Sequence, residues 1–211
     1  MDNTLDKSKM TEGQIFALPF FEFVSQDLPM DIDMIALIAG HCKPVAFKKG
    51  CRLLETGADG KYIYFIVSGQ GISYFTDYNG KTTTWFFHFN TPEASVKNVF
   101  AVDYKSFLSG APATISIETL TDVTALRFSR DDVHFLTYNC ALFEKWMRLV
   151  NERAFIMIYD RLSTLLTLSA TDRYKKFLAD EPHLLNMFSN YYIASYLDVA
   201  PQSLSRIRKN I

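Results

Sequence analysis

Residues 45–129 show the hydrophobic pattern of a series of short strands. Runs of β-branched and aromatic residues alternate with glycines, and "KYIYFIVSG" (61–69) is one such run, closed by Gly69. Val, Ile, Tyr and Phe favour the pleated backbone of a strand, and Gly commonly ends one. The pattern therefore predicts a β-rich module in the first two thirds of the chain.

Two strand pairs are predicted inside this module. Residues 71–89 form two strand-like runs around Asn79-Gly80, a dipeptide that favours a type I′ turn because both residues tolerate positive φ. Residues 114–120 and 123–129 form two further runs around Thr121-Asp122. We expect a hairpin at the first position and a second strand pair at the other.

The periodicity becomes helical after Ser129, which can cap a short helix, and Asn139 can cap the next one. From Cys140 to about Ser169 there is no Gly or Pro. Apolar residues first alternate four and three positions apart: Phe143, Met147, Val150, Ala154 and Met157. The next position of this repeat is Arg161, so the apolar series shifts by one residue to Ile158, Leu162 and Leu165. This heptad seam favours a long dimerisation helix. An intramolecular helix that covers the β-module is the alternative.

Three shorter helices are predicted after the long one. The first covers about 169–185, with Ser169 or Thr171 as its cap and Pro182 as its stop. The second begins near Tyr191 and buries Ile193 and Leu197. The chain then turns at Asp198, and a third helix begins at Pro201 and buries Leu204 and Ile207. This is the pattern of a helix-turn-helix unit.

The other face of the last helix carries polar and basic side chains: Gln202, Ser203, Ser205, Arg206 and Lys209. Arg commonly reads guanine and Gln reads adenine in the major groove, whereas Ser and Lys more often contact phosphate. On spacing alone, a packed helical hairpin with a solvated face remains an alternative to a DNA reader.

Composition limits the classes of function. The 211 residues are 48% hydrophobic and carry a net charge of −1, so any nucleic-acid surface must be a local patch. No run is long enough to span a membrane, and the polar start "MDNTLDKSKMTEG" is unlike a signal peptide. Three cysteines without a CxxC motif predict free thiols. A bacterial-type cytoplasmic protein is expected.

Several segments together resemble the Crp/Fnr family of transcription regulators. "KKGCRLLETGADGKYIYFIVSGQGISYFTDYNGKTTTWFF" (48–87) is similar to the family's β-roll, and "IASYLDVAPQSLSRIRKNI" (193–211) is similar to its recognition unit. The long helix lies between them, as in the family. The resemblance implies an α+β fold: an N-terminal double-stranded β-helix, or jelly-roll-like, domain, a long dimerisation helix and a C-terminal helix-turn-helix domain.

The resemblance also implies boundaries and partners. The expected parts are a cyclic-nucleotide-binding-like sensor (1–138), a dimerisation helix (139–168) and a DNA-binding domain (169–211). A homodimer would bind palindromic double-stranded DNA, with RNA polymerase and an unidentified small-molecule effector as further partners. By position, Gln202, Ser203 and Arg206 would face base edges. Ser205, Arg208 and Lys209 would contact the DNA backbone or support the residues that do. The sequence ends just after this helix, so we expect no family wing.

The effector pocket departs from the family pattern. Relatives that bind cyclic AMP carry a Phe-Gly-Glu segment and, ten residues after the Glu, an Arg that holds the cyclic phosphate. Asp103 stands at the carboxylate position and Val102 at the Gly position, and Thr114 supplies a hydroxyl, but Ala113 replaces the Arg. Since a charged contact to phosphate is among the stronger single contacts, we expect no binding of cyclic AMP in the usual way.

Other cofactors are not expected either. Three scattered cysteines are too few for an iron–sulfur cluster, and the four isolated histidines favour neither heme nor a metal site. An apolar effector, or none, remains open. The alternative to a regulator is a small-molecule-binding or interaction module with a vestigial DNA-binding tail. An enzyme is disfavoured, because the sequence offers no nucleophile–base pair.

Overall fold

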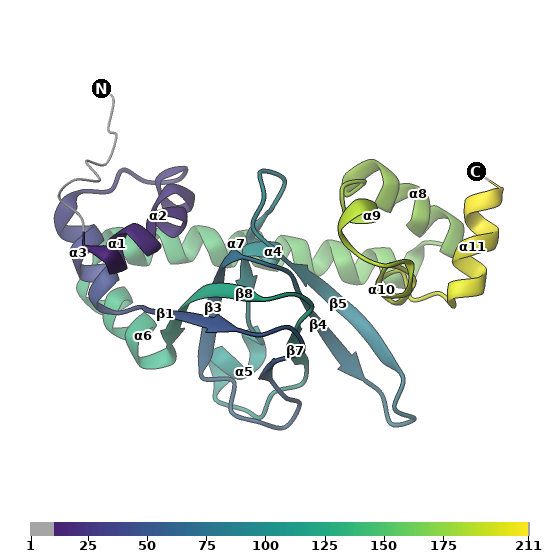
Figure 1. Cartoon of the computed structure of the whole chain (residues 1–211), viewed down its shortest axis with the longest axis horizontal. Helices are drawn as coiled ribbons and strands as arrows, with labels where there is room; N and C mark the ends of the chain where they lie inside the picture. Colours follow the sequence, from purple (N-terminus) through teal and green to yellow (C-terminus); the bar gives the residue numbers. More distant parts are fainter. Residues whose placement is uncertain (1–10, 211) are drawn as a thin grey trace.

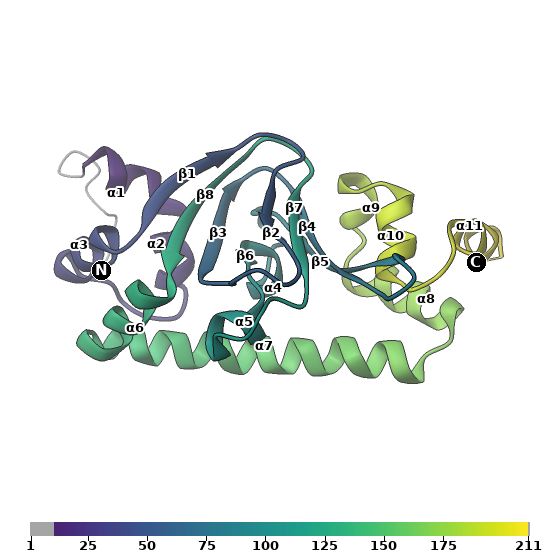
Figure 2. The same cartoon turned by 90° about the horizontal axis from the view of Figure 1, so that it is seen from below.

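A computed structural model describes residues 11–210, so the predictions for the polar N-terminus (1–10) and Ile211 lie outside the described residues. The long helix α7 (Ala141–Thr167) runs along the whole molecule (Figures 1 and 2). A β-roll sits on its middle, with N-terminal helices at one end and C-terminal helices at the other. The predicted α+β fold with a β-roll, a long helix and a helical C-terminal part is confirmed.

The β-roll consists of two four-stranded antiparallel sheets. One has the order β1-β8-β3-β6 and the other β2-β7-β4-β5. The strands are β1 (Lys43–Phe47), β2 (Arg52–Leu54), β3 (Tyr62–Ser68), β4 (Gly71–Thr76), β5 (Thr82–His88), β6 (Phe100–Ala101), β7 (Ser116–Thr119) and β8 (Val123–Ser129). Two short helices, α4 (Val96–Val99) and α5 (Tyr104–Ser109), interrupt them. In the second sheet β5 is an edge strand.

The hairpin of β4 and β5 forms as predicted, but its turn differs. The loop is Asp77–Lys81, and Gly80 takes φ of 80° while Asn79 is not among the residues with positive φ. The carboxylate of Asp77 accepts hydrogen bonds from the backbone N–H groups of Asn79 (2.8 Å) and Lys81 (2.9 Å). The type I′ prediction is therefore wrong: a side-chain-supported five-residue loop needs only one left-handed residue.

The second predicted strand pair is also corrected. β7 and β8 are strands as expected, but they do not pair with each other. β7 pairs with β2 and β4, whereas β8 pairs with β1 and β3. Thr121 and Asp122 carry the chain from one sheet to the other, which is how a roll closes around an interior.

The helices before and after the roll begin at side-chain caps where the sequence offers them. Asp31 caps α3 (Ile32–Gly40), and Ser129 caps α6 (Arg130–Asn139) in a capping box with Asp132. Helices α1 (Glu12–Phe16) and α2 (Leu18–Ser25) precede α3. Asn139 does not cap α7: it ends α6, and Cys140 is the N-cap residue without a side-chain hydrogen bond.

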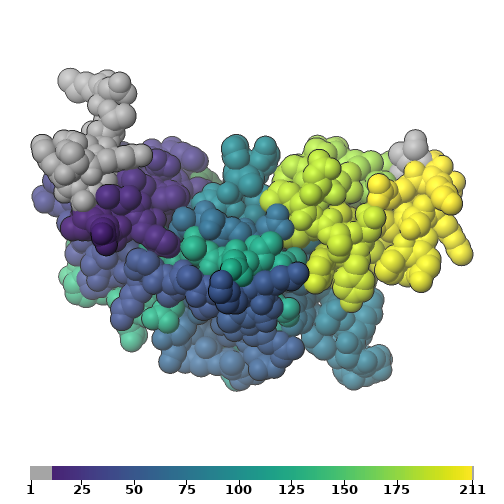
Figure 3. Space-filling model, in the orientation of Figure 1, coloured from purple at the N-terminus to yellow at the C-terminus, as the bar shows by residue number. Residues whose placement is uncertain are grey.

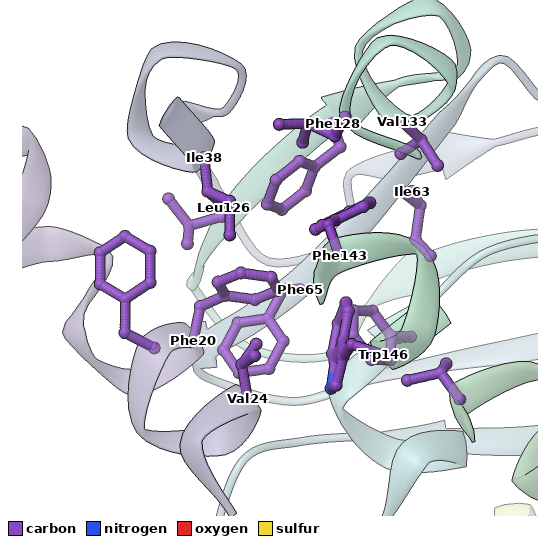
Figure 4. Close-up of a cluster of buried hydrophobic side chains, with 14 of the residues drawn as sticks. Phe20, Val24, Ile38, Ile63, Phe65, Leu126, Phe128, Val133, Phe143 and Trp146 are labelled. Atoms are coloured by element: carbon purple, nitrogen blue, oxygen red, sulfur yellow. The ribbon is translucent and has the colours of Figure 1, made fainter. Parts of the chain in front are cut away.

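The main core lies between the N-terminal helices, one sheet of the roll and the first half of α7 (Figure 4). Trp146 of α7 packs edge-on against Phe20 of α2, with ring centroids 5.5 Å apart, and lies beside Phe143. Phe65 of β3 completes the contact with Phe20. The first half of α7 is therefore held by its own chain.

The C-terminal part contains four helices, with bounds α8 (Ala170–Asp180), α9 (Leu184–Met187), α10 (Asn190–Tyr196) and α11 (Pro201–Lys209). Ser169 caps α8, as predicted. These helices share a second core with strand β5, built on Phe87, Phe188 and Tyr196. The domain boundaries at 138 and 168 remain predictions.

Candidate DNA-binding surface and effector region

The turn between α10 and α11 has the geometry that the sequence predicts. Asp198 has φ of 51°, the only positive φ of a non-glycine residue within 11–210. The N–H of Val199 donates to the carbonyl of Ala194 (3.0 Å), which closes the end of α10. Pro201 stands in the first turn of α11, where its missing N–H costs no hydrogen bond. A sharp, defined angle between the two helices follows.

Helix α11 has one buried and one solvated face. Leu204 is 2% exposed, and Ile207 is half-buried beside it. The polar residues are exposed apart from the half-buried Ser203: Gln202, Ser205, Arg206, Arg208 and Lys209. The helix lies at the extreme end of the molecule (Figure 3). The six predicted DNA-binding residues therefore share one helix with an open outer face.

Two of these side chains have local partners. Arg208 donates to the side-chain oxygen of Asn190 (2.7 Å), and the Ser205 hydroxyl donates to the carbonyl of Pro201 (3.1 Å). These bonds hold Arg208 toward α10 and Ser205 toward its own helix. That Ser205 and Arg208 contact the DNA backbone, or support residues that do, remains a prediction. The contacts of Gln202, Ser203 and Arg206 with DNA bases also remain a prediction.

Helix α10 packs against β5, an edge strand of the β-roll. The N–H of Thr84 in β5 donates to the Ser195 hydroxyl (2.9 Å), which donates to the carbonyl of Thr82 (3.2 Å). Lys81 forms an ion pair with Asp198 (3.0 Å). Edge-strand groups that would otherwise need water are thus satisfied by the helix-turn-helix unit. The orientation of the helix-turn-helix unit is therefore fixed relative to the roll.

Asp103 lies at the centre of the predicted effector region and is only 4% exposed. One carboxylate oxygen caps α5 by accepting from the N–H of Ser106 (3.1 Å). The other accepts from the N–H of Thr114 (2.6 Å), its hydroxyl (3.1 Å) and the N–H of Ile115 (3.2 Å). Ala113 is buried beside them. The sequence brings Asp103, Ala113 and Thr114 together as predicted, but around an internal carboxylate.

Comparisons with known proteins agree with this geometry. Residues 44–137 match the family model of the cyclic nucleotide-binding domain. The structure resembles FixK2 from Bradyrhizobium japonicum, with a TM-score of 0.65, 16% identity and coverage of 80% of this chain and 83% of that one. It also resembles the c-di-GMP-responsive global regulator CLP of Xanthomonas campestris: TM-score 0.65, 13% identity, coverage 85% and 91%.

A third solved structure is a transcriptional regulator of the Crp/Fnr family from Eubacterium rectale, with a TM-score of 0.63, 15% identity and coverage of 89% of this chain and 85% of that one. The chain has the fold of the Crp/Fnr transcription regulators. At these identities the likeness establishes the fold. No curated protein matches the sequence.

In this Crp/Fnr fold, the carboxylate of Asp103 takes up the hydrogen-bond donors next to Ala113, the position where the resemblance places the Arg that holds a cyclic phosphate. Those donors are the backbone N–H and hydroxyl of Thr114 and the N–H of Ile115. A phosphate placed there would have to displace a buried carboxylate of the same charge. The absence of an Arg at position 113 and the hydrogen-bonded carboxylate of Asp103 both disfavour binding of a cyclic phosphate.

A small cavity next to α5 is lined by none of Asp103, Ala113 and Thr114. An apolar cavity of about 20 Å³ lies between α5, the roll and α7, and Tyr104, Phe107 and Trp146 are among its walls. A ligand pocket usually measures some 300 Å³ or more. Burial raises the pKa of the Tyr104 phenol well above its usual range. This cavity is therefore too small to hold an effector.

The predicted seam residues of α7 divide into two groups. Phe143, Val150 and Ala154 are buried in the chain's own core, as the intramolecular alternative requires. Met147, Met157, Ile158 and Leu165 are half-buried, and Leu162 is exposed. A second stripe is exposed to solvent, and only Leu162 in it was predicted: Phe155, Ile156, Tyr159, Leu162 and Leu166. In the second half of the helix, this stripe is the apolar surface open to a partner.

Arg161 is a structural residue that the sequence signals only as a break in the seam. It is 7% exposed, donates to the carbonyls of Tyr196 and Thr84, and lies 3.7 Å from the centre of the Tyr196 ring. Burial lowers its pKa from the usual value. A charged residue at a strict heptad position was the available sign that this part of α7 faces something polar.

The described residues limit two further classes of site. No helix within 11–210 is both long enough and apolar enough to cross a membrane. In the same range, no three His, Cys, Asp or Glu side chains gather as metal ligands would. The predicted absence of metal, heme and iron–sulfur cofactors stays a prediction.

Proposed function

We propose that this chain is a homodimeric, sequence-specific DNA-binding transcription regulator of the Crp/Fnr type. The observation that carries the proposal is the α10–α11 unit: a left-handed turn at Asp198, a buried Leu204 and an exposed polar face at one end of the molecule. A helix presented in this way fits the major groove. The fold adds support, since its solved examples include a Crp/Fnr transcriptional regulator.

The exposed stripe of α7 supports the dimer. Phe155, Ile156, Tyr159 and Leu166 are each at least 60% exposed, with values of 71, 60, 64 and 75%. Large apolar side chains that cluster on one helix face commonly mark an interface. Two copies joined along α7 would present two recognition helices, which matches a two-fold palindrome when they lie about 34 Å apart.

We predict that Arg206→Ala weakens specific binding by about 1–3 kcal/mol and relaxes the preference for one base pair. The physical reason is the loss of a side chain that can donate two hydrogen bonds to guanine. The measurement is a selection from genomic DNA with purified protein, followed by titration of the enriched site at several salt concentrations. Affinity should fall steeply as salt rises.

The matched control is Arg52→Ala, which removes an exposed Arg on β2 that pairs with Glu55 (2.6 Å). It should leave the affinity and the base preference unchanged. If the selection enriches no palindrome, the regulator proposal fails. The alternative, a small-molecule-binding or interaction module with a vestigial DNA-binding tail, is then favoured.

We further predict that neither cyclic AMP nor cyclic GMP binds with micromolar affinity, measured by calorimetry on the full chain. Ala113→Arg alone should not create binding, because the donors of Thr114 and Ile115 remain held by Asp103. Micromolar binding of either nucleotide to the wild type would contradict this account of the effector region.

A further inference from the structure

A cavity of about 410 Å³ lies between the β-roll and the C-terminal helices. Its walls come from α4 and α7, from α8 with the adjoining Glu181, and from Tyr196 of α10. Figure 2 shows α7 passing beneath both the roll and these helices. The volume falls in the range of small-molecule pockets, roughly 300–1,000 Å³. The cavity is separate from Asp103 and Thr114.

Most cations around this cavity are already neutralised. Lys97 pairs with Glu181 (2.5 Å), and Lys176 pairs with Asp180 (2.7 Å). Arg153 forms a two-bond ion pair with Asp27, which lies outside the cavity lining. Each of these three positive charges has a carboxylate beside it.

Arg161 also lines the cavity and differs from the other three cations. Within residues 11–210 it has no carboxylate within ion-pair distance, and its Nε is buried without a hydrogen-bond partner. Its contacts are two backbone carbonyls and the ring of Tyr196. A buried charge without a counterion is unfavourable, since the interior cannot replace the lost hydration. An anion in the cavity would supply the missing partner.

The remaining walls indicate what kind of anion fits. Phe86, Val96, Met157, Phe177 and Tyr196 give the cavity an apolar lining. One further carboxylate, Asp160, lines it near Lys176, whose pKa is raised by the hydrogen bond to Asp180 and, more weakly, by the charge of Asp160. A single unpaired cation and a nearby carboxylate favour a monoanion over a dianion such as phosphate.

We propose that this cavity between the roll and the C-terminal helices binds an organic carboxylate with an apolar body, whose carboxylate pairs with Arg161. Such a ligand would touch α4 of the roll and α8 and α10 of the C-terminal part together. Because it would bind only where these parts are docked, it would stabilise the docked arrangement of the recognition helix. That regulatory consequence rests on the proposed function; the binding itself does not.

The test uses 2-naphthoate and its neutral analogue 2-naphthamide, titrated into the full chain by calorimetry without DNA. We expect one site per chain and about tenfold tighter binding of the carboxylate, the difference that a charge-assisted hydrogen bond supplies. Arg161→Gln should make the two affinities equal. Arg148→Gln, which removes an exposed Arg of the same helix outside the cavity lining, should leave the tenfold difference intact.

Met157→Trp keeps Arg161 but fills the cavity with a larger side chain, and it should abolish binding of both probes. The proposal is overturned if neither probe binds at millimolar concentration, if the wild type binds both equally, or if Met157→Trp binds as the wild type does. Since no DNA is present, failure of the proposed DNA binding would leave these results unaffected.

Discussion

Trp146→Ala is expected to destabilise the folded chain by about 3–5 kcal/mol, the usual cost of truncating a fully buried large aromatic side chain. Trp146 is 1% exposed and contacts the rings of Phe20, Phe100 and Phe143. These rings belong to α2, β6 and α7, so the substitution opens a cavity where three elements meet. Urea unfolding followed by circular dichroism measures the loss as a lower midpoint with an unchanged slope.

Trp146→Phe provides the matched comparison. The indole N–H of Trp146 is buried without a hydrogen-bond partner within residues 11–210. Phe keeps much of the ring contact and removes that unsatisfied donor, whose burial is itself unfavourable. We therefore expect a much smaller loss than for Ala. Tyr138→Ala, at a side chain that is 88% exposed, should change stability by less than about 0.5 kcal/mol. Equal losses for Ala and Phe would contradict the packing account.

Local chemistry explains which elements could be predicted from the sequence. Ser129 and Ser169 cap helices in the structure, because a hydroxyl next to the first turn satisfies a free N–H wherever the rest of the chain goes. The left-handed turn at Asp198 and the helix start at Pro201 follow from equally local preferences. The last two features belong to the helix-turn-helix unit of α10 and α11, so the backbone of that unit was largely predictable, whereas its contacts with DNA remain a prediction.

Pairing between distant segments was harder to predict. Proximity along the chain suggested that β7 pairs with β8, but the short connection at Thr121-Asp122 crosses between sheets instead. Period and spacing do not distinguish these two outcomes. The same limit applies to α7, where a heptad seam fits a partner helix and the chain's own core equally well. The structure uses Phe143 and Val150 for the core and leaves a stripe exposed that shares only Leu162 with the predicted seam.

The packing of α10 against β5 could not be predicted from the sequence. It depends on hydrogen bonds between distant residues, such as Ser195 and Thr84, which are 111 residues apart. Its consequence for function is direct. In the Crp/Fnr fold seen here, the effector region around Asp103 is internally satisfied, whereas the junction between roll and recognition unit holds a buried Arg161 and a sizeable cavity. For the regulator proposed above, this geometry favours an effector at the junction over one at Asp103.

Acid is expected to weaken the fold well above the range in which carboxylates titrate, and His88 is the reason. This side chain of β5 is 2% exposed, and burial lowers its pKa from 6.5 to about 4. The folded protein keeps His88 neutral between these values, while the unfolded chain binds a proton. The unfolded state thus binds more protons, so stability falls as pH falls from about 6.5 toward 4 and then levels off for this group. At about 1.4 kcal/mol per pKa unit, the full loss is about 3 kcal/mol.

His88→Leu should remove this loss, since Leu carries no proton in either state. Backbone groups of Lys97 and Asn98 lie near the His88 ring, but neither ring nitrogen makes a hydrogen bond of normal geometry within residues 11–210, so an apolar replacement should be tolerated at pH 7. Urea unfolding at pH 7 and pH 5 measures the difference. Carboxylates with lowered pKa, such as Asp122, lose their contribution only below about pH 4, so the interval isolates histidine. His134→Leu, at an exposed position, should lose as much stability between pH 7 and pH 5 as the wild type does. An unchanged acid loss in His88→Leu would show that another group is responsible.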